Sequence, residues 1–475
     1  MEDEVMPVNS FDDYPMSWKP QRTELEQPYY LSIAARLESD ILSGNLPENT
    51  KLPPQRELAD FLDLNVSTIT RAYKLCELKG LLYAVTGKGT FVSSGLSAQD
   101  TFFSRNGGMI ELGMIQPFYE TNGKVLQAAQ RVISSQDSLR LFEYSDPLGT
   151  AGQLSSAKKW LRLLGVHVKS DHILLSAGAQ NALSVILISL FQSGDKIAVD
   201  RFTYTNFRTL ANFLHIQLIA VDGDDCGMLP SALSAVCKHT QINGIYLMPT
   251  CSNPTGIFMP QNRREELAEI IRHYDLLLIE DDIYSFLSAF GNPAGRTIPF
   301  FHLLPENTIH ICSVSKSLCA GLRAAFVAFP HRYRDLLTAG MLNINLKTVS
   351  LGGEIAAEMI ESGEAERTAR EKIMLARSRN RIFDTIFPAP KTRQIEPFFR
   401  WLPIPDGLTS EELEILALKK GVHVLGSHRF ALQSGTDTSS FVRLSVTSPH
   451  TEDDLRTGLM ILKKVLEEKR TDFIV

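Results

Sequence analysis

Between residues 172 and 315, short apolar runs rich in β-branched residues alternate with longer stretches of helical pattern. A strand that is apolar at every position is buried on both faces, which is typical of a parallel sheet covered by helices. The runs are HILLSAG, DKIAVD, INGIYLMP, DLLLIEDD and TIHICSVS. This alternation predicts an α/β domain with a mostly parallel sheet and helices on both of its faces.

The rest of the chain divides around this domain. Residues 1–22 contain five acidic and two basic residues, prolines and no apolar period, and we expect them to form an acidic tail. Residues 94–112 are rich in Ser and Gly at both ends, which indicates a linker to a large domain at 113–475. Strand-like runs and a helix from Thr451 predict a smaller α+β subdomain at about 390–475.

The composition is that of an ordinary soluble globular protein, with 21% charged residues, a net charge of -6 and a mean hydropathy of -0.04. The longest apolar stretch, 182–191, is too short to span a bilayer, and the acidic N-terminus lacks the basic region of a signal peptide. Six cysteines without a C-x-x-C pair suggest neither a disulfide framework nor a metal site. We therefore expect a cytoplasmic protein.

Residues 23–93 have the pattern of a winged helix-turn-helix. A run with helical spacing ends at SGN, 43–45, and LPPQRELADFL starts a second helix near Gln55. Asn65 is a good N-cap for a third helix, which buries Ile69, Tyr73 and Cys76 on one face. The segment LLYAVTGKGTFV then predicts two strands around a Gly-Lys-Gly tip, as in a wing.

A helix that enters the major groove must present hydrogen-bonding groups to bases and phosphates. Residues 51–88 hold six basic and four acidic residues, so the charged footprint is narrow. Each polar residue taken alone could equally be a solvated helix or turn residue. The DNA-binding candidates are Arg56 at the second helix, Ser67, Thr68, Thr70, Arg71 and Lys74 on the third, and Lys88 at the wing tip.

Residues 28–92 resemble the winged helix-turn-helix of GntR-type bacterial regulators. The matching pieces are ILSG, QRELA, STITRAYKL and GKGTFV. Pro54 stands where relatives have a serine, and Val66 stands where they have an arginine. The resemblance implies a double-stranded DNA operator as partner, but these two differences mean that the operator sequence of relatives does not transfer.

Lys316 lies in SVSKSLCAGLR, just past a strand end, where ligands of open α/β sheets bind. A lysine there can form an imine with pyridoxal 5'-phosphate, whose other groups each need a partner. Asp281, at the end of another apolar run, could keep the pyridine nitrogen protonated. Tyr284 and Asn253 could bind the phenolic oxygen. Taken singly, these are also an ordinary strand-end acid, a partly buried tyrosine and a turn asparagine.

The phosphate of such a cofactor needs amides, hydroxyls and a cation. A strand runs through Gly178 into a helix whose first amides would face an anion. Tyr204 could stack on the pyridine ring or be a core aromatic. The candidates for the phosphate are the amides of Ala179 and Gln180, the hydroxyls of Ser313 and Ser315, and the guanidinium group of Arg323.

The pieces YSDPLG, SAGAQ, FTYTN, NPTG, EDDIY, SVSKSLCAGLR and VRLS resemble fold-type I aminotransferases in order and spacing. The resemblance implies that Lys316 forms the Schiff base and that the other residues hold the cofactor as described. It also implies that Tyr144 of one subunit contacts the phosphate in its partner, and that Arg443 binds the α-carboxylate of the substrate. Cys319 and Ala320 replace an Ala-Pro pair of relatives.

A GntR-type winged helix followed by an aminotransferase-like domain is the arrangement of the MocR subfamily of regulators. This resemblance covers nearly the whole chain and implies a homodimer, usually head-to-tail. The first hypothesis is a transcriptional regulator that senses an amine or amino acid by aldimine exchange at Lys316. Two alternatives stay open at this point: a working aminotransferase, and a sensor of pyridoxal phosphate itself.

Overall fold

The computed structural model describes residues 16–43, 45–47, 50–78, 81–85, 89–92, 109–136, 138–292, 295–348, 350–388, 393–432 and 440–471. The chain divides into two compact units, Met1–Gly107 and Gly108–Val475. Among the described residues, no helix is long and apolar enough to cross a membrane.

The N-terminal unit has the predicted winged helix-turn-helix. Its elements are η1 (Arg22–Glu24), α1 (Tyr29–Leu42), α2 (Gln55–Leu62), α3 (Val66–Leu78) and the antiparallel strands β1 (Leu82–Val85) and β2 (Gly89–Val92). Asn65 caps α3, because its Oδ1 accepts a hydrogen bond from the backbone N–H of Ser67 at 3.0 Å. Ile69, Tyr73 and Cys76 are buried, which confirms the predicted inner face of this helix.

Two of the expected boundaries, those of the tail and of the linker, differ from the structure. Trp18 was expected in a tail, but it is only 6% exposed and its indole Nε1 donates to Asp40 Oδ2 at 2.9 Å. A lone tryptophan among prolines carries no helical period, so the pattern did not reveal this packing. Residues 110–112 were expected in the linker, but they belong to the C-terminal unit, where β3 (Ile110–Glu111) pairs with β14 (Val422–His423) and Leu112 is buried.

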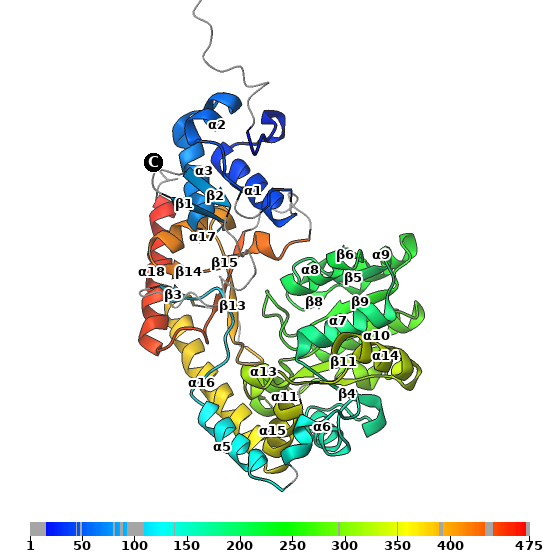
Figure 1. Cartoon of the computed structure of the whole chain (residues 1–475). Coiled ribbons are helices and arrows are strands. Elements are labelled where there is room, and N and C mark those ends of the chain that lie inside the picture. Colours follow the sequence, from blue (N-terminus) through cyan, green and yellow to red (C-terminus); the bar gives the residue numbers. More distant parts are fainter. Residues whose placement is uncertain are drawn as a thin grey trace, which may run out of the picture. The chain divides into compact units, whose positions relative to one another are not determined.

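The C-terminal unit is built on a seven-stranded sheet with the order β4-β12-β11-β10-β9-β5-β6. Its strands β4, β11, β9, β5 and β6 are labelled in Figure 1. All neighbouring strands are parallel except β12, which is antiparallel to both of its neighbours. The predicted mostly parallel sheet is therefore confirmed. Its strands are β4 (Ile173–Ser176), β5 (Lys196–Asp200), β6 (Gln217–Val221), β9 (Gly244–Leu247), β10 (Leu277–Asp281), β11 (Thr308–Ser313) and β12 (Ala325–Ala328).

Helices cover both faces of this sheet, as the apolar strands predicted. Successive side chains of a strand point to opposite faces. Ile279 of β10 packs in a cluster with α7 (Ala179–Leu190), α8 (Thr205–Phe213) and α14 (Arg334–Asn345). The preceding residue, Leu278, points to the opposite face and packs in a second cluster with α9 (Pro230–His239), α10 (Gln261–His273) and α12 (Phe300–Leu303). Both positions are therefore apolar, and the strand lacks the alternation of apolar and polar residues that is typical of a strand with one exposed face.

The C-terminal subdomain contains a three-stranded antiparallel sheet of β13 (Phe399–Pro403), β16 (Phe441–Ser445) and β15 (Leu425–Gly426), with α17 (Ser410–Lys419) and α18 (Glu452–Thr471). Its core also includes Leu112 and Phe383, so the subdomain starts before the expected residue 390. The long helix α16 (Glu364–Ile386) contacts both α18 and α13 (Val314–Ser317), and it can be followed in yellow in Figure 1.

The other elements of this unit connect these layers. The helices α5 (Asn122–Ile133), α6 (Ala151–Leu163) and α15 (Ser350–Glu361) share a buried cluster with β4, β12 and α16. The remaining short elements are β7 (Gly223–Asp224), β8 (Gly227–Met228), α11 (Ser285–Gly291), η2 (Ser138–Phe142), η3 (Ser170–His172), η5 (Ala320–Leu322), η6 (His331–Tyr333) and η7 (Ser427–Arg429).

Candidate functional site

Lys316 lies in the short helix α13, directly after strand β11. The residue is half-buried, and its Nζ donates a hydrogen bond to the carbonyl oxygen of Ile115 at 2.5 Å. Burial, and then the positive charges of Arg443, Lys372 and Arg323, lower the pKa of this amine to about 7. A large share of the amine is therefore neutral near pH 7, which is the form that attacks a carbonyl group.

Asp281 is the last residue of β10, on the strand next to β11, and it is 2% exposed. Its Oδ2 accepts a hydrogen bond from the hydroxyl group of Tyr246 at 2.8 Å. Its Oδ1 is buried and has no hydrogen-bond partner among the described residues. Burial raises the pKa of this carboxyl group to about 7. A buried acceptor without a partner fits a protonated ring nitrogen, whose charge would stabilise the carboxylate.

A close approach between Gly178 and Arg323 forms a cradle for an anion. Gly178 precedes α7 with a φ of 92°, and a Cβ atom there would lie 2.5 Å from Arg323 Nη2. The first amides of α7, those of Ala179 and Gln180, have no partner within the helix and start beside this guanidinium group. Ser313, the last residue of β11, donates from its hydroxyl group to that of Ser315 at 3.2 Å. These two hydroxyl groups, the amides at the start of α7 and the Arg323 guanidinium group are groups that fit a phosphate.

Arg443, on β16, has a charged group held in place by three contacts. Nη1 donates to Asn253 Oδ1 at 2.7 Å, and Nη2 donates to the carbonyl oxygen of Gly113 at 2.7 Å. The guanidinium group lies 4.6 Å from the ring centroid of Phe430. Burial lowers the pKa of Arg443 to about 10, so the group stays charged at neutral pH. A fixed, buried guanidinium group fits a carboxylate ligand.

Two tyrosines complete the constellation. Tyr204 precedes α8, and burial followed by the charge of Asp281 raises its pKa to about 12. Tyr284 is 2% exposed, packs against Phe398 and Phe399, and has a pKa well above its usual value, chiefly because of burial. Both phenols keep their protons at neutral pH and can donate hydrogen bonds. The charges of Arg443 and Asp281 both affect the pKa values of these two tyrosines, so all four residues lie close together.

The fold brings together all the predicted cofactor residues except Tyr144. That residue follows η2 and is 85% exposed, and no hydrogen bond joins it to the others among the described residues. Two residues of the site were not predicted. Tyr246, the partner of Asp281, is the one aromatic in the run INGIYLMP. Lys372 of α16 donates to the carbonyl oxygens of Lys316 and Leu318. The buried face of this helix also carries Thr368, Arg379 and Asn380, so no sequence signal distinguished Lys372.

The predicted DNA-binding residues lie on α2 and α3 of the N-terminal unit. All those within the described residues are exposed except Thr68, which is half-buried. Thr70 Oγ1 donates to Gln55 Oε1 at 2.7 Å, which ties α3 to α2. The guanidinium group of Arg71 lies 4.0 Å from the ring centroid of Tyr30. Lys88, expected at the wing tip, falls outside the described residues.

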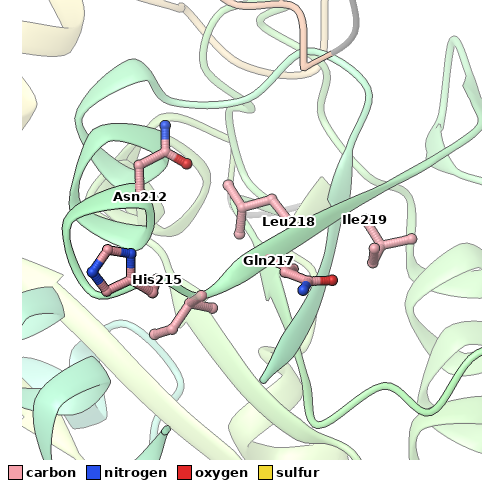
Figure 2. Close-up of a pocket in the computed structure, with 6 residues that line it drawn as sticks. Asn212, His215, Gln217, Leu218 and Ile219 are labelled. Atoms are coloured by element: carbon pink, nitrogen blue, oxygen red, sulfur yellow. The ribbon is translucent and has the colours of Figure 1, made fainter. Parts of the chain in front are cut away.

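A surface pocket between α8 and the edge strand β6 lies outside this constellation (Figure 2). It is lined by Asn212, His215, Ile216, Gln217, Leu218 and Ile219. None of these residues belongs to the predicted site, and we assign the pocket no role in it.

Comparisons with known proteins agree with both units. Residues 29–92 match the family "Bacterial regulatory proteins, gntR family", and residues 108–462 match "Aminotransferase class I and II". The chain is 38% identical to YdeF, an HTH-type transcriptional regulator of Bacillus subtilis whose function is uncharacterized, over 98% of this chain and 100% of that protein.

Solved structures with the same fold include a kynurenine aminotransferase from Pyrococcus horikoshii, with a TM-score of 0.70, 24% identity, and coverage of 79% of this chain and 99% of that one. Another is LysN, an α-aminoadipate aminotransferase from Thermus thermophilus complexed with N-(5'-phosphopyridoxyl)-L-leucine, with a TM-score of 0.68, 22% identity, and coverage of 82% and 97%. The predicted cofactor, pyridoxal 5'-phosphate, is thus confirmed by the family, and the residues described above fit it. The chain belongs to the aminotransferase class I and II family and, with its gntR-family N-terminal domain, to the MocR-type regulators.

Proposed function

We propose that this protein is a pyridoxal-phosphate-dependent transcriptional regulator whose affinity for operator DNA depends on an amino acid or amine bound at Lys316. The observation that supports this most is the set of half-buried Lys316 with buried Asp281 and Arg443 in a chain that also carries a winged helix-turn-helix. The bound cofactor supplies an electrophilic carbon that can accept an amine in place of Lys316. A protein that regulates genes in this way acts in the cytoplasm, where its DNA lies.

In this proposal each residue of the site has a defined task. Asp281 holds the proton of the ring nitrogen, and Tyr284 and the amide nitrogen of Asn253 hold the phenolic oxygen. Ser313, Ser315, Arg323 and the amides of Ala179 and Gln180 bind the phosphate, and Tyr204 stacks on the ring. Arg443 binds the carboxylate of the effector. Arg443 lies on the C-terminal subdomain, whereas Lys316 lies in the part of the unit that holds the seven-stranded sheet. An amino acid would therefore bridge the two subdomains and favour one arrangement of them.

We expect an added amino acid to change operator affinity by about 5- to 150-fold, the range of a coupling free energy of about 1–3 kcal/mol. The test titrates the cofactor-loaded protein with the DNA fragment upstream of its own gene, with and without each of the twenty common L-amino acids. Fluorescence anisotropy gives the dissociation constant. A protein that binds the fragment equally well under all conditions would contradict the proposal. Comparing protein with and without cofactor identifies a sensor of the cofactor itself.

The proposal also gives Lys74 of α3 a contact with the DNA backbone. We expect Lys74→Ala to weaken binding by about 5- to 10-fold, and to reduce the slope of log affinity against log salt by about 1, because one phosphate is no longer neutralised. Anisotropy titrations over a series of salt concentrations measure both quantities. Lys464→Ala, which removes the same charge from an exposed position on α18, is the matched control. An unchanged salt slope in the Lys74 variant would remove this residue from the interface.

We further propose that the protein is a head-to-tail homodimer in which Tyr144 of one subunit contacts the phosphate bound by the other. The observation in favour is the exposure of large apolar residues around η2, where Leu139, Phe142 and Tyr144 are 76%, 77% and 85% exposed. A dimer would bury this surface and place two winged helices on repeated or inverted half-sites.

A working aminotransferase is the second candidate. Lys316, Asp281 and Arg443 together are the groups that transamination needs, and a 2-aminoadipate transaminase of Thermus thermophilus is 27% identical over 69% of this chain and 82% of that protein. Incubation with an amino acid and a keto acid distinguishes the two candidates. Multiple turnovers per site without any effect on operator binding would favour the enzyme.

A further inference from the structure

We propose that Lys372 is a positioning residue for Lys316: its buried ammonium group holds the backbone at and after Lys316, and its positive charge acts on the reactive amine. This inference rests on the proposed function, because it concerns how readily Lys316 accepts the cofactor. Lys372 belongs to none of the motifs that carry the aminotransferase resemblance. It lies 56 residues from Lys316 in the sequence, on the long helix α16.

The contacts of Lys372 fix the end of the helix that carries Lys316. Its Nζ donates to the carbonyl oxygen of Leu318 at 2.5 Å and to that of Lys316 at 3.4 Å. Helix α13 spans only Val314–Ser317, so its last carbonyl groups lack partners within the helix. The ammonium group supplies them with charge-assisted hydrogen bonds. Lys372 is 0% exposed, so no solvent competes for these bonds.

The charge of Lys372 also acts on the Lys316 amine. Burial lowers the pKa of Lys372 to about 8, while Cys319, Glu120 and Glu371 act in the opposite direction, so the group is mostly protonated at pH 7. Lys316 faces this charge together with those of Arg443 and Arg323, and all three favour its neutral form. A solvated amine at the end of a loop would be almost entirely protonated at that pH.

Helix α16 connects the backbone contacts of Lys372 to the C-terminal subdomain. Ile382 and Phe383, further along the same helix, pack in one cluster with Val442 and Leu444. Those two residues flank Arg443 on β16. The same helix therefore contacts the backbone at Lys316 and shares a core with the strand that carries the expected carboxylate-binding residue, and its Arg379 donates to the carbonyl oxygen of Val446 just after that strand. A shift of this helix would move both.

The test compares Lys372→Gln, which keeps a donor without a charge, with Lys372→Arg, which keeps both. The rate of pyridoxal 5'-phosphate attachment to the cofactor-free protein is followed by absorbance from pH 6 to 9. In the wild type the rate should rise through a midpoint near 7, as the Lys316 amine loses its proton. In Lys372→Gln we expect the midpoint to rise by about one pH unit, and the rate at pH 7 to fall about fivefold. Lys372→Arg should restore the midpoint.

Lys159→Met is the matched control, because it removes a lysine whose ion pair with Glu361 lies at the surface. It should leave the midpoint unchanged. Thermal unfolding of each cofactor-free variant separates a folding defect from a change at Lys316. A Lys372→Gln variant that melts earlier but keeps the wild-type midpoint would overturn the inference alone, since Lys372 would then be only structural. A wild-type protein that takes up no cofactor would overturn the proposed function and this inference with it.

Discussion

The Lys316→Ala variant should keep its basal affinity for operator DNA and lose its response to amino acids. In the proposed function the effector displaces the amine of Lys316 from the cofactor, so a variant without this amine has no covalent bond for the effector to replace. The change of about 5- to 150-fold expected for the wild type should fall to about 1 in the variant. The absorbance band of covalently attached cofactor should disappear as well. Anisotropy titrations with and without amino acid measure the first effect, and an absorbance spectrum measures the second.

The control for this experiment is Lys169→Ala, which removes an exposed lysine from the same unit. It should behave like the wild type in both measurements. Among the described residues, the side chain of Lys316 makes one hydrogen bond, to the carbonyl oxygen of Ile115. Its replacement should therefore cost the fold little, and basal DNA binding tests this. A variant that still responds to amino acids would show that the effector is sensed elsewhere, and the proposed mechanism would be wrong.

The fold could be predicted from the sequence wherever burial dictates composition. Leu278 and Ile279 are both apolar because helices cover both faces of β10, and this signal does not depend on how the strand pairs with distant ones. The direction of a strand in the sheet has no comparable signal in the sequence. AFVA at 325–328 is as apolar as its neighbours, yet β12 runs antiparallel between β11 and β4. The packing of Trp18 against Asp40 was also hidden, because one side chain in an irregular segment makes no period.

The candidate site was predictable because its groups follow strand ends. Asp281 ends β10 and Lys316 follows β11, so two adjacent parallel strands bring them to one edge of the sheet. Because each chemical group of one cofactor needs a partner, residues far apart in the sequence could be assigned to the same site. Tyr246 and Lys372 could not be found this way, because they act through other residues. Each is a polar group on a buried surface, and only the fold shows which buried acceptor it faces.

The proposed role of Arg443 in binding the effector's carboxylate leads to a prediction with a similarly large effect. Arg443→Gln should weaken the response to an amino acid by roughly 3 kcal/mol, on the order of 100-fold in effective concentration, because two charge-assisted hydrogen bonds to the carboxylate are lost. The response to the matching amine without a carboxylate should change by less than about threefold, since that ligand makes no such bonds. Operator titrations with leucine against 3-methylbutylamine, and with tyrosine against tyramine, measure the difference.

This paired design separates ligand binding from damage to the fold. Arg443 also holds Asn253 and the carbonyl group of Gly113, so its replacement disturbs the site itself. Such damage would weaken the response to amino acid and amine alike. Only the ratio of these two responses measures the contribution of the carboxylate. Arg443→Lys, which keeps the charge but not the two-pronged geometry, should recover part of the ratio. If the ratio is the same in all three proteins, the carboxylate binds elsewhere, and the two subdomains are not bridged by the effector at Arg443.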